Sequence, residues 1–184
     1  MMWYRIKRNI IRIVYSILLK DNVTCARKLG VRIGERCKIL DEPGAVFGSE
    51  PWLVTIGNHV EITNGVRFLT HEGALWCLRD IVSGFKYADL FLPVVVGNNV
   101  MIGMNSLIMP GITIGDNVII GAHAVVTSDI PSNTVFAGVP ARQISTVEKF
   151  AEKMTGNHEI LHIKNLGQAQ KLDKLKEVHP EWFS

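Results

Sequence analysis

"VGNNVMIGMNSLIMPGITIGDNVIIGAHAVVTSDIP", residues 96–131, repeats a six-residue pattern without a break. Each block opens with an aliphatic side chain, and these first positions are Val96, Ile102, Ile108, Ile114, Ile120 and Val126. A period of six matches neither the roughly 3.6-residue period of an amphipathic helix nor the two-residue alternation of a half-buried strand. Short strands separated by a sharp corner after each block account for a period of six. The repeat therefore predicts a coil with three blocks per turn, whose first-position aliphatics point into a narrow interior.

The same pattern occurs earlier in the chain. IGNHVEITNGVRFLTHEG, residues 56–73, holds it from Ile56, and IGERCK, residues 33–38, is an earlier turn whose phase has slipped. Glycine and asparagine recur beside the first positions, as at Gly57–Asn58 and Gly97–Asn98, and both residue types tolerate tight or left-handed corners. Because stacked coils pair strand to strand, the first and last coils leave open edges that need caps.

An irregular segment, THEGALWCLRDIVSGFKYADLFLP at residues 70–93, separates the two repeat blocks. A long loop on a rigid scaffold is a functional signal. Trp76 and Arg79 are of the kinds that stack on sugar rings and pair with phosphate, so we expect them to contact the substrate. The alternative is that the aromatic residues of this loop simply pack it onto a neighbouring coil.

Three features together resemble the hexapeptide-repeat acyltransferases: the repeat, the histidine-containing FLTHEG at residues 68–73, and VVTSDIPSNTVFAGVPARQI at residues 125–144. The similarity covers roughly residues 30–145 and is greatest to the sugar O-acetyltransferases of capsule and lipopolysaccharide synthesis. It implies an all-β fold, a left-handed parallel β-helix, assembled as a homotrimer. It also implies acetyl-CoA as the donor, a hydroxyl of a sugar or surface-polysaccharide precursor as the acceptor, and direct transfer in a ternary complex. The sequence leaves the acceptor open, and an acyl group slightly larger than acetyl remains an alternative.

His71 is the predicted general base. The acceptor hydroxyl must lose its proton as it attacks the thioester, and a neutral imidazole suits that task near neutral pH. Glu72 is expected to orient the imidazole or to contact the substrate, with an ordinary exposed loop carboxylate as the alternative. Asn64 lies one corner earlier and is assigned to the acceptor site by resemblance, although a corner-forming asparagine explains it equally well.

The resemblance also implies positions along the groove that holds the donor. These are Met104, Ala122, Thr127, Ser128 and Arg142. Arg142 is the expected phosphate partner, since a guanidinium matches phosphate geometry. Met104 and Ser128 replace a serine and a lysine of the family pattern, and Ala122 and Thr127 are equally explained as ordinary repeat positions.

Three other functions compete with this interpretation. Cys77 lies close to His71 in sequence, so a cysteine–histidine nucleophile is one alternative. A zinc enzyme similar to the carbonic anhydrases would use His59, His71 and His123, but the sequence lacks the close histidine pair of such a site, and no metal is predicted. The third alternative is a scaffold or sugar-binding module without activity.

The N-terminal 30 residues form a lead-in to the coil, and residues 1–20 have the spacing of an amphipathic helix. Residues 1–40 carry ten basic and two acidic side chains, hence +8, and because the whole chain carries +3 the rest carries −5. No nucleic-acid motif accompanies this charge. The helix either packs on the core or touches the inner face of a membrane, and its apolar run is too short to cross one.

The remaining boundaries follow from where the repeat stops. We expect the β-helix over residues 31–144 and a helical tail over residues 145–184, which caps the last coil. The cysteine count is odd, without a paired motif, which argues against a disulfide framework and for a reducing cytoplasm.

Overall fold

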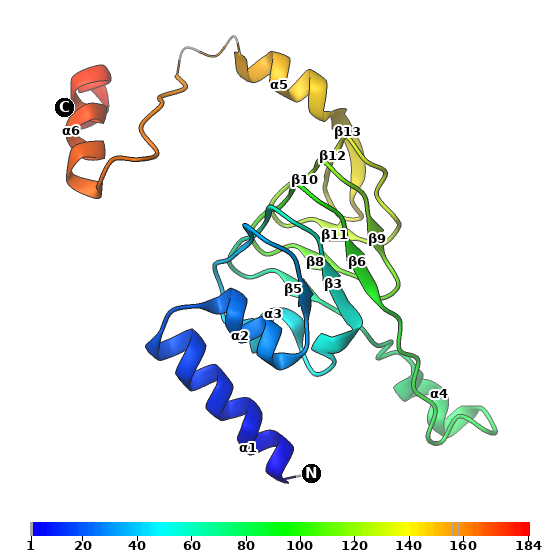
Figure 1. Cartoon of the computed structure of the whole chain (residues 1–184). Helices are drawn as coiled ribbons and strands as arrows, with labels where there is room; N and C mark the ends of the chain where they lie inside the picture. Colours follow the sequence, from blue (N-terminus) through cyan, green and yellow to red (C-terminus); the bar gives the residue numbers. More distant parts are fainter. Residues whose placement is uncertain (1, 156, 158) are drawn as a thin grey trace. The chain divides into compact units, whose positions relative to one another are not determined.

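The computed structural model describes residues 2–155, 157 and 159–184, and it divides into two compact units, residues 1–150 and 151–184. Met1, Gly156 and His158 therefore lie outside the described residues. The first unit is built on a coil of short parallel strands, with helices at the N-terminal end of the coil (Figure 1).

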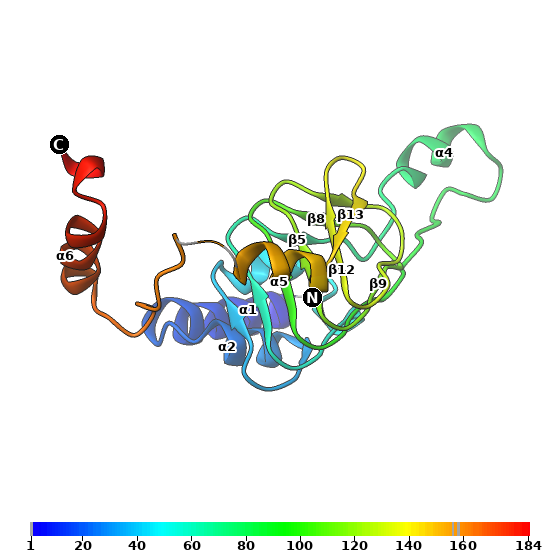
Figure 2. The ribbon, with the colours of Figure 1, turned by 90° about the horizontal axis from the view of Figure 1, so that it is seen from above.

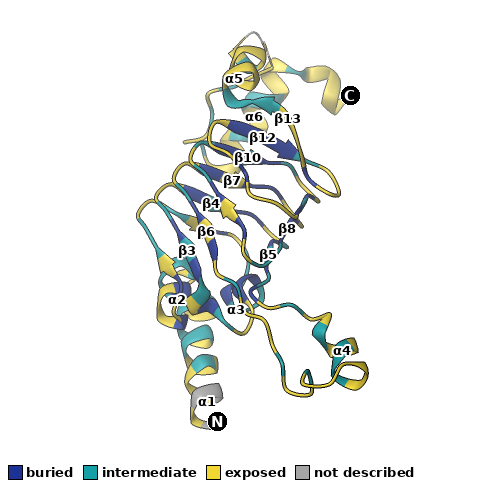
Figure 3. Ribbon diagram, turned by 90° about the vertical axis from the view of Figure 1, so that its right-hand side faces the viewer, coloured by how far each residue is buried: buried dark blue, intermediate teal, exposed yellow. Residues whose placement is uncertain are grey.

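Three sheets form the sides of the coil (Figures 1 and 3). Sheet A contains β1 (Arg32–Ile33), β3 (Val54–Ile56), β6 (Val94–Val96) and β9 (Thr113–Ile114). Sheet B contains β2 (Lys38–Ile39), β4 (Val60–Ile62), β7 (Val100–Ile102), β10 (Val118–Ile120), β12 (Thr134–Ala137) and β13 (Arg142–Thr146). Sheet C contains β5 (Arg67–Phe68), β8 (Leu107–Ile108) and β11 (Val125–Val126).

The register of these strands follows the repeat. Val96 pairs with Ile114, Ile102 with Ile120, and Ile108 with Val126, always in parallel. Each pair is 18 residues apart, so three blocks of six complete one turn. The six first-position aliphatics are at most 2% exposed. The predicted parallel coil with an aliphatic interior is thus confirmed.

One corner of the coil, between sheets A and B, is a column of left-handed residues. His59, Asn99, Asn117 and Asn133 have φ between 54° and 64°. Their side chains are hydrogen-bonded from coil to coil, with Asn99 donating to Asn117 at 2.9 Å and Asn117 to Asn133 at 2.8 Å. The left-handed position thus falls one residue after the glycine–asparagine pairs that the sequence singled out.

Two short helices cover the first coil. Helix α2 (Asn22–Leu29) buries Cys25, Ala26 and Leu29, and α3 (Pro43–Phe47) buries Phe47, whose ring stacks on Phe68 at 5.3 Å. A short 3₁₀ helix, η2 (Pro51–Leu53), follows. The N-terminal helix itself consists of α1 (Met2–Ile11) and a π-helical continuation, η1 (Arg12–Leu18). The cap of this end therefore comes from α2 and α3.

A strand closes sheet B at the other end of the coil. β13 runs antiparallel to β12, so it pairs the backbone groups that an edge strand would expose. The sequence predicted that the helical tail covers the open edge of the last coil, but on sheet B this place is taken by β13. Helix α5 (Val147–Thr155) starts after β13 and crosses the boundary between the units, which falls after Phe150 and not at residue 145. The second unit contains α6 (Gln168–Val178) and η3 (Pro180–Phe183).

The irregular segment forms an arm that leaves the coil. The strand pattern stops at Phe68 and resumes at Val94, and α4 (Leu75–Ile81) lies between them. All residues of α4 are exposed or half-buried, and three views show the helix away from the coil (Figures 1, 2 and 3). Within the part of the chain that is described, no helix has the length and apolar character needed to span a bilayer.

Candidate active site

His71 stands at the base of the arm, at the corner between sheets C and A. Its backbone forms an antiparallel bridge with Phe91, and the N–H of Leu92 donates to the Thr70 carbonyl at 2.9 Å. These pairings tie the two ends of the arm together. His71 is therefore fixed by backbone hydrogen bonds although the arm beyond it projects outward.

Glu50 is the partner of the His71 ring. The imidazole Nδ1 lies 3.0 Å from Glu50 Oε2, and the Thr70 hydroxyl donates to the same oxygen at 2.9 Å. Burial would raise the pKa of the Glu50 carboxyl, but hydrogen bonds from His71, Ser49 and Thr70 outweigh it and hold that pKa below its ordinary value. An ionised carboxylate only accepts hydrogen bonds, so it favours the tautomer of the neutral ring that has the proton on Nδ1 and the lone pair on Nε2.

The environment leaves the other side of the ring accessible. The His71 side chain is 48% exposed, whereas that of Glu50 is only 16% exposed. Sequence reasoning missed Glu50, which lies 21 residues before His71 in the irregular stretch that precedes η2. The only sequence signal was a carboxylate outside the repeat, and only the stacking of the coils brings it to the histidine.

Glu72 does not take the orienting role that the sequence offered for it. Its carboxylate accepts the N–H of Ala74 at 2.8 Å, which stabilises the turn into α4. The structure thus brings Glu50, and not Glu72, to the imidazole. Glu72 remains beside His71 in the chain, at the mouth of the same corner.

The two predicted substrate residues on α4 differ in their exposure and their contacts. Trp76 is 74% exposed. Arg79 donates to the Asp89 carboxylate at 2.5 Å and to the Ala88 carbonyl at 3.3 Å, and its guanidinium lies 5.6 Å from the Trp76 ring centre. Arg79 therefore holds the arm together, and the Trp76 ring is left largely exposed.

Two corner columns flank sheet C, and they contain four of the five predicted donor positions. Arg67, Leu107 and Val125 are paired across this sheet, so Asn64, Met104 and Ala122, three residues earlier, stack at one corner. Backbone bonds run along this column, from the Asn105 N–H to the Asn64 carbonyl at 3.0 Å and from the His123 N–H to the Met104 carbonyl at 2.7 Å. All three stacked residues are exposed.

The second column is the one that contains His71. The same register places Thr127 and Ser128 two coils beyond Leu69 and Thr70, a separation of about 10 Å at the usual strand spacing. Arg142 follows Ala141, whose N–H donates to the Val125 carbonyl at 2.8 Å. The predicted donor positions and His71 thus flank one sheet, although they are far apart in sequence.

The three histidines of the alternative zinc site are separated. His59 lies at the corner between sheets A and B, His123 at the corner between B and C, and His71 at the corner between C and A. Among the described residues no group of three or more histidine, cysteine or carboxylate side chains could hold a metal ion. Cys77 is exposed on α4.

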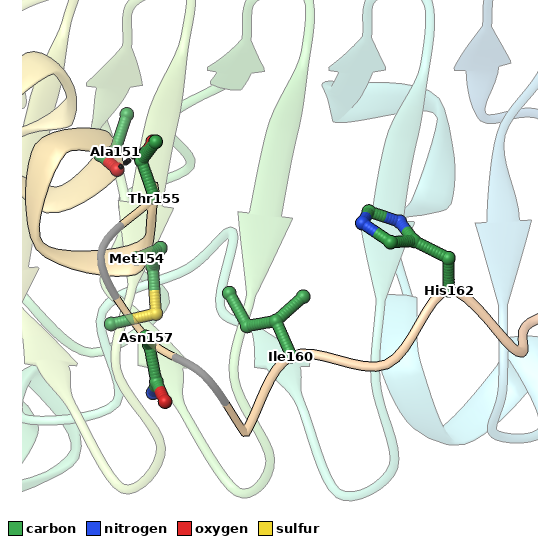
Figure 4. Close-up of a pocket in the computed structure, with 6 residues that line it drawn as sticks. All are labelled: Ala151, Met154, Thr155, Asn157, Ile160 and His162. Atoms are coloured by element: carbon green, nitrogen blue, oxygen red, sulfur yellow. Dashed lines mark hydrogen bonds between the residues drawn. The ribbon is translucent and has the colours of Figure 1, made fainter.

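A hollow in the second unit contains none of the predicted site residues. It is lined by Ala151, Met154, Thr155, Asn157, Ile160 and His162 (Figure 4). All of them belong to the tail, so this hollow is not part of the site at His71.

Comparison with known proteins identifies the family. The family model described as bacterial transferase hexapeptide, six repeats, matches residues 93–128. Protein CapG of Staphylococcus aureus is 41% identical over 175 residues, which cover 93% of this chain and 97% of CapG. The chain belongs to the hexapeptide-repeat acetyltransferases. The acyltransferase class predicted from the sequence is thereby confirmed.

Other hexapeptide-repeat acetyltransferases match parts of the chain. The galactoside O-acetyltransferase of Escherichia coli is 43% identical over 99 residues, which are 53% of this chain and 46% of that enzyme. A solved hexapeptide-repeat acetyltransferase from Vibrio cholerae has a TM-score of 0.62 at 22% identity and covers 79% of this chain and 92% of its own, which shows a shared fold. The Vibrio enzyme has also been solved in complex with acetyl coenzyme A.

Proposed function

We propose that the protein transfers an acetyl group from acetyl-CoA to a hydroxyl of a sugar or surface-polysaccharide precursor. The observation that carries the proposal is the Glu50–His71 pair, which fixes the imidazole tautomer and leaves Nε2 accessible. Family membership supports acetyl transfer. The named substrate class of the Escherichia coli relative supports a sugar hydroxyl as the acceptor.

The reaction requires one proton acceptor and no acyl-enzyme. Nε2 of His71 takes the hydroxyl proton while the acceptor oxygen attacks the thioester carbonyl. The tetrahedral intermediate then collapses, the carbon–sulfur bond breaks, and the imidazolium returns its proton to the departing CoA thiolate. The Glu50 carboxylate stabilises the imidazolium through Nδ1–H and holds the ring in place.

We assign the donor to the flank of sheet C. Ala122 and Met104 present exposed backbone and side chains at one corner, and Thr127 and Ser128 at the other, so an extended pantetheine arm can run along the coils. Arg142 is exposed on β13 and would pair with a phosphate of CoA. The known acetyl-CoA complex of the Vibrio enzyme supports acetyl-CoA as the donor substrate.

We assign the acceptor to the space between His71 and the arm. The exposed Trp76 ring suits stacking on a sugar face. Glu72 adds a polar group to this region, and Arg79 is assigned to the support of Trp76. Asn64 lies at the opposite corner of sheet C, in the column of Met104 and Ala122.

The family also supports three broader proposals. The coil would wind left-handed, three copies would form a homotrimer with sites between neighbouring subunits, and the protein would work in the cytoplasm, where acetyl-CoA is available. The free thiols of Cys25, Cys37 and Cys77 are compatible with a reducing compartment.

The direct test is thiol release from acetyl-CoA over a panel of sugars, nucleotide sugars and lipid-linked glycans. We expect His71→Ala to lower kcat by about 10²–10⁴-fold while CoA still binds. His59→Asn is the matched control, because asparagine already occupies the equivalent left-handed corners, and it should retain wild-type turnover. Full activity of His71→Ala would exclude the base assignment. Absence of both turnover and CoA binding in the wild type would favour a scaffold instead.

A further inference from the structure

The N-terminal helix turns its apolar face outward. Trp3, Ile6, Ile10, Ile13 and Ile17, hereafter the apolar stripe, recur at intervals of three and four residues and so share one face of α1 and η1. Their exposed fractions run from 45% to 79%. Figure 3 shows α1 coloured exposed or half-buried along its described side chains.

Two arginines on the opposite face of the helix bind the residues on either side of α3. Arg8 donates to the carbonyls of Gly48 and Ser49 at 2.8 and 3.0 Å. Arg12 donates from two nitrogens to the two carboxylate oxygens of Glu42, at 2.7 and 2.8 Å. A helix that merely covered the core would bury its aliphatic residues and expose its arginines. Here both arginines are half-buried and hydrogen-bonded, and the apolar stripe is exposed, so the docked helix presents the apolar stripe outward.

Cationic side chains accompany the apolar stripe. Lys7 in the middle of α1 and Lys20, two residues after η1, are exposed, and residues 1–40 together carry +8. Exposed aliphatic residues with a terminal tryptophan and flanking lysines are the composition of a helix that lies in a membrane interface. A second copy of this chain fits less well, because facing helices would bring like charges together.

We infer that α1 and η1 are a docking surface for a bilayer that contains anionic lipid. The apolar stripe would enter the boundary between headgroups and acyl chains, and Lys7 and Lys20 would meet anionic headgroups. The helix lies in the plane of the membrane and does not cross it. This inference does not depend on the acetyl transfer proposed above.

Flotation of the full chain with phosphatidylcholine vesicles, with and without phosphatidylglycerol, tests the surface. We expect binding to the anionic vesicles and at least about tenfold weaker binding by Ile10→Asp/Ile17→Asp. Lys7→Gln/Lys20→Gln should lose about fivefold per lysine on anionic vesicles and nothing on neutral ones. Ile160→Asp, which places the same change at an isoleucine that is 43% exposed in the tail, should bind like the wild type.

Two results would overturn the inference. One is a wild-type chain that does not float with anionic vesicles. The other is equal binding by the wild type and Ile10→Asp/Ile17→Asp, with circular dichroism showing that both are folded. If instead the wild type does not bind vesicles and Ile10→Asp/Ile17→Asp lowers the molecular mass of the assembly, the apolar stripe is a contact between copies of this chain.

Discussion

Glu50 contributes to the site by accepting a hydrogen bond from Nδ1 of His71, which leaves Nε2 as the ring nitrogen that acts as the base. In Glu50→Gln the side-chain amide can donate to Nδ1, which favours the wrong tautomer of His71. We expect kcat to fall on the order of 10²–10⁴-fold with little change in KM. Steady-state kinetics measure this, with Glu61→Gln on β4 of sheet B, outside the proposed site, as the control carboxylate. Wild-type kcat in Glu50→Gln would remove Glu50 from the mechanism.

The cysteines should differ sharply in reactivity. Burial raises the pKa of the Cys25 thiol to about 11, and Cys25 is fully buried, whereas Cys77 is exposed on α4. Because the thiolate is the reacting form, iodoacetamide at about pH 8 should modify Cys77 and spare Cys25 until the chain unfolds. Mass spectrometry of the labelled peptides shows which thiol reacts. Modification of both at equal rates would contradict the packing of α2 on the first coil.

Gly65 is required by its backbone conformation and by its neighbour. Its φ is +77°, and a Cβ there would collide with the Asn105 carboxamide and lie 3.3 Å from the Asn105 Cα. We expect Gly65→Ala to reduce the free energy of unfolding by about 1–3 kcal/mol. Gly73→Ala is the control, since a Cβ at Gly73 meets open space. Urea unfolding compares the two, and equal stability would contradict the corner geometry.

Residues of the repeat were predictable and those of the site only partly so, for a physical reason. Burial of Ile102 or Ile114 follows from a local period, which the sequence displays directly. The Glu50–His71 contact joins two segments outside the repeat. No local sequence pattern indicates that these two segments lie next to each other in the folded chain. His71 could be singled out because a histidine at the start of the insertion suggests a general base, whereas Glu50 lies in an irregular stretch without a motif.

The attachment of the N-terminal helix should weaken in acid. Burial would raise the pKa of the Glu42 carboxyl, but the Arg12 guanidinium and the N–H groups of Gly44 and Ala45 lower it overall. A lowered folded-state pKa adds stability above the unfolded value of about 4.3, and this stability is lost as the pH falls through the folded value. Thermal unfolding followed from pH 7 to 3 should therefore show a smaller acid-dependent decline in Glu42→Gln.

Glu42 is not the only carboxyl that makes the stability depend on pH in this way. The pKa values of Asp41 and Glu50 are also lowered by their hydrogen bonds. Glu42→Gln should therefore reduce the decline without abolishing it. An unchanged pH dependence would mean that the Arg12–Glu42 contact does not form in solution.

At the scale of an element, sequence periodicity predicts where a helix forms but not which of its faces packs on the protein. The sequence predicted an amphipathic helix over residues 1–20, and α1 with η1 spans residues 2–18. It did not settle which face docks, because that depends on Glu42 and on the carbonyls of Gly48 and Ser49, which the fold brings near. The cap on sheet B was likewise not predicted, since a strand that pairs with its own neighbour looks like any short polar segment.

At the scale of the whole molecule, the arm is a second exposed apolar feature, besides the apolar stripe. Trp76, Ile81 and Tyr87 are 74%, 75% and 85% exposed, which is costly for side chains of this size unless another surface covers them. The proposed trimer supplies such a surface, because the arm and His71 of one subunit would face the sheet C flank of the next. Each site would then contain groups from two chains.

Mixed trimers test this arrangement. His71→Ala removes the base and leaves the sheet C flank intact, whereas Ala122→Trp fills the flank and leaves His71 intact. Each variant alone should be inactive. If a site combines His71 of one subunit with the flank of its neighbour, co-expressed subunits should regain about a quarter of wild-type turnover, because a random cyclic trimer pairs the two intact halves at that frequency. Thiol release by the purified mixture gives the answer. Activity no greater than the sum of the two parents would place His71 and the donor flank in the same chain.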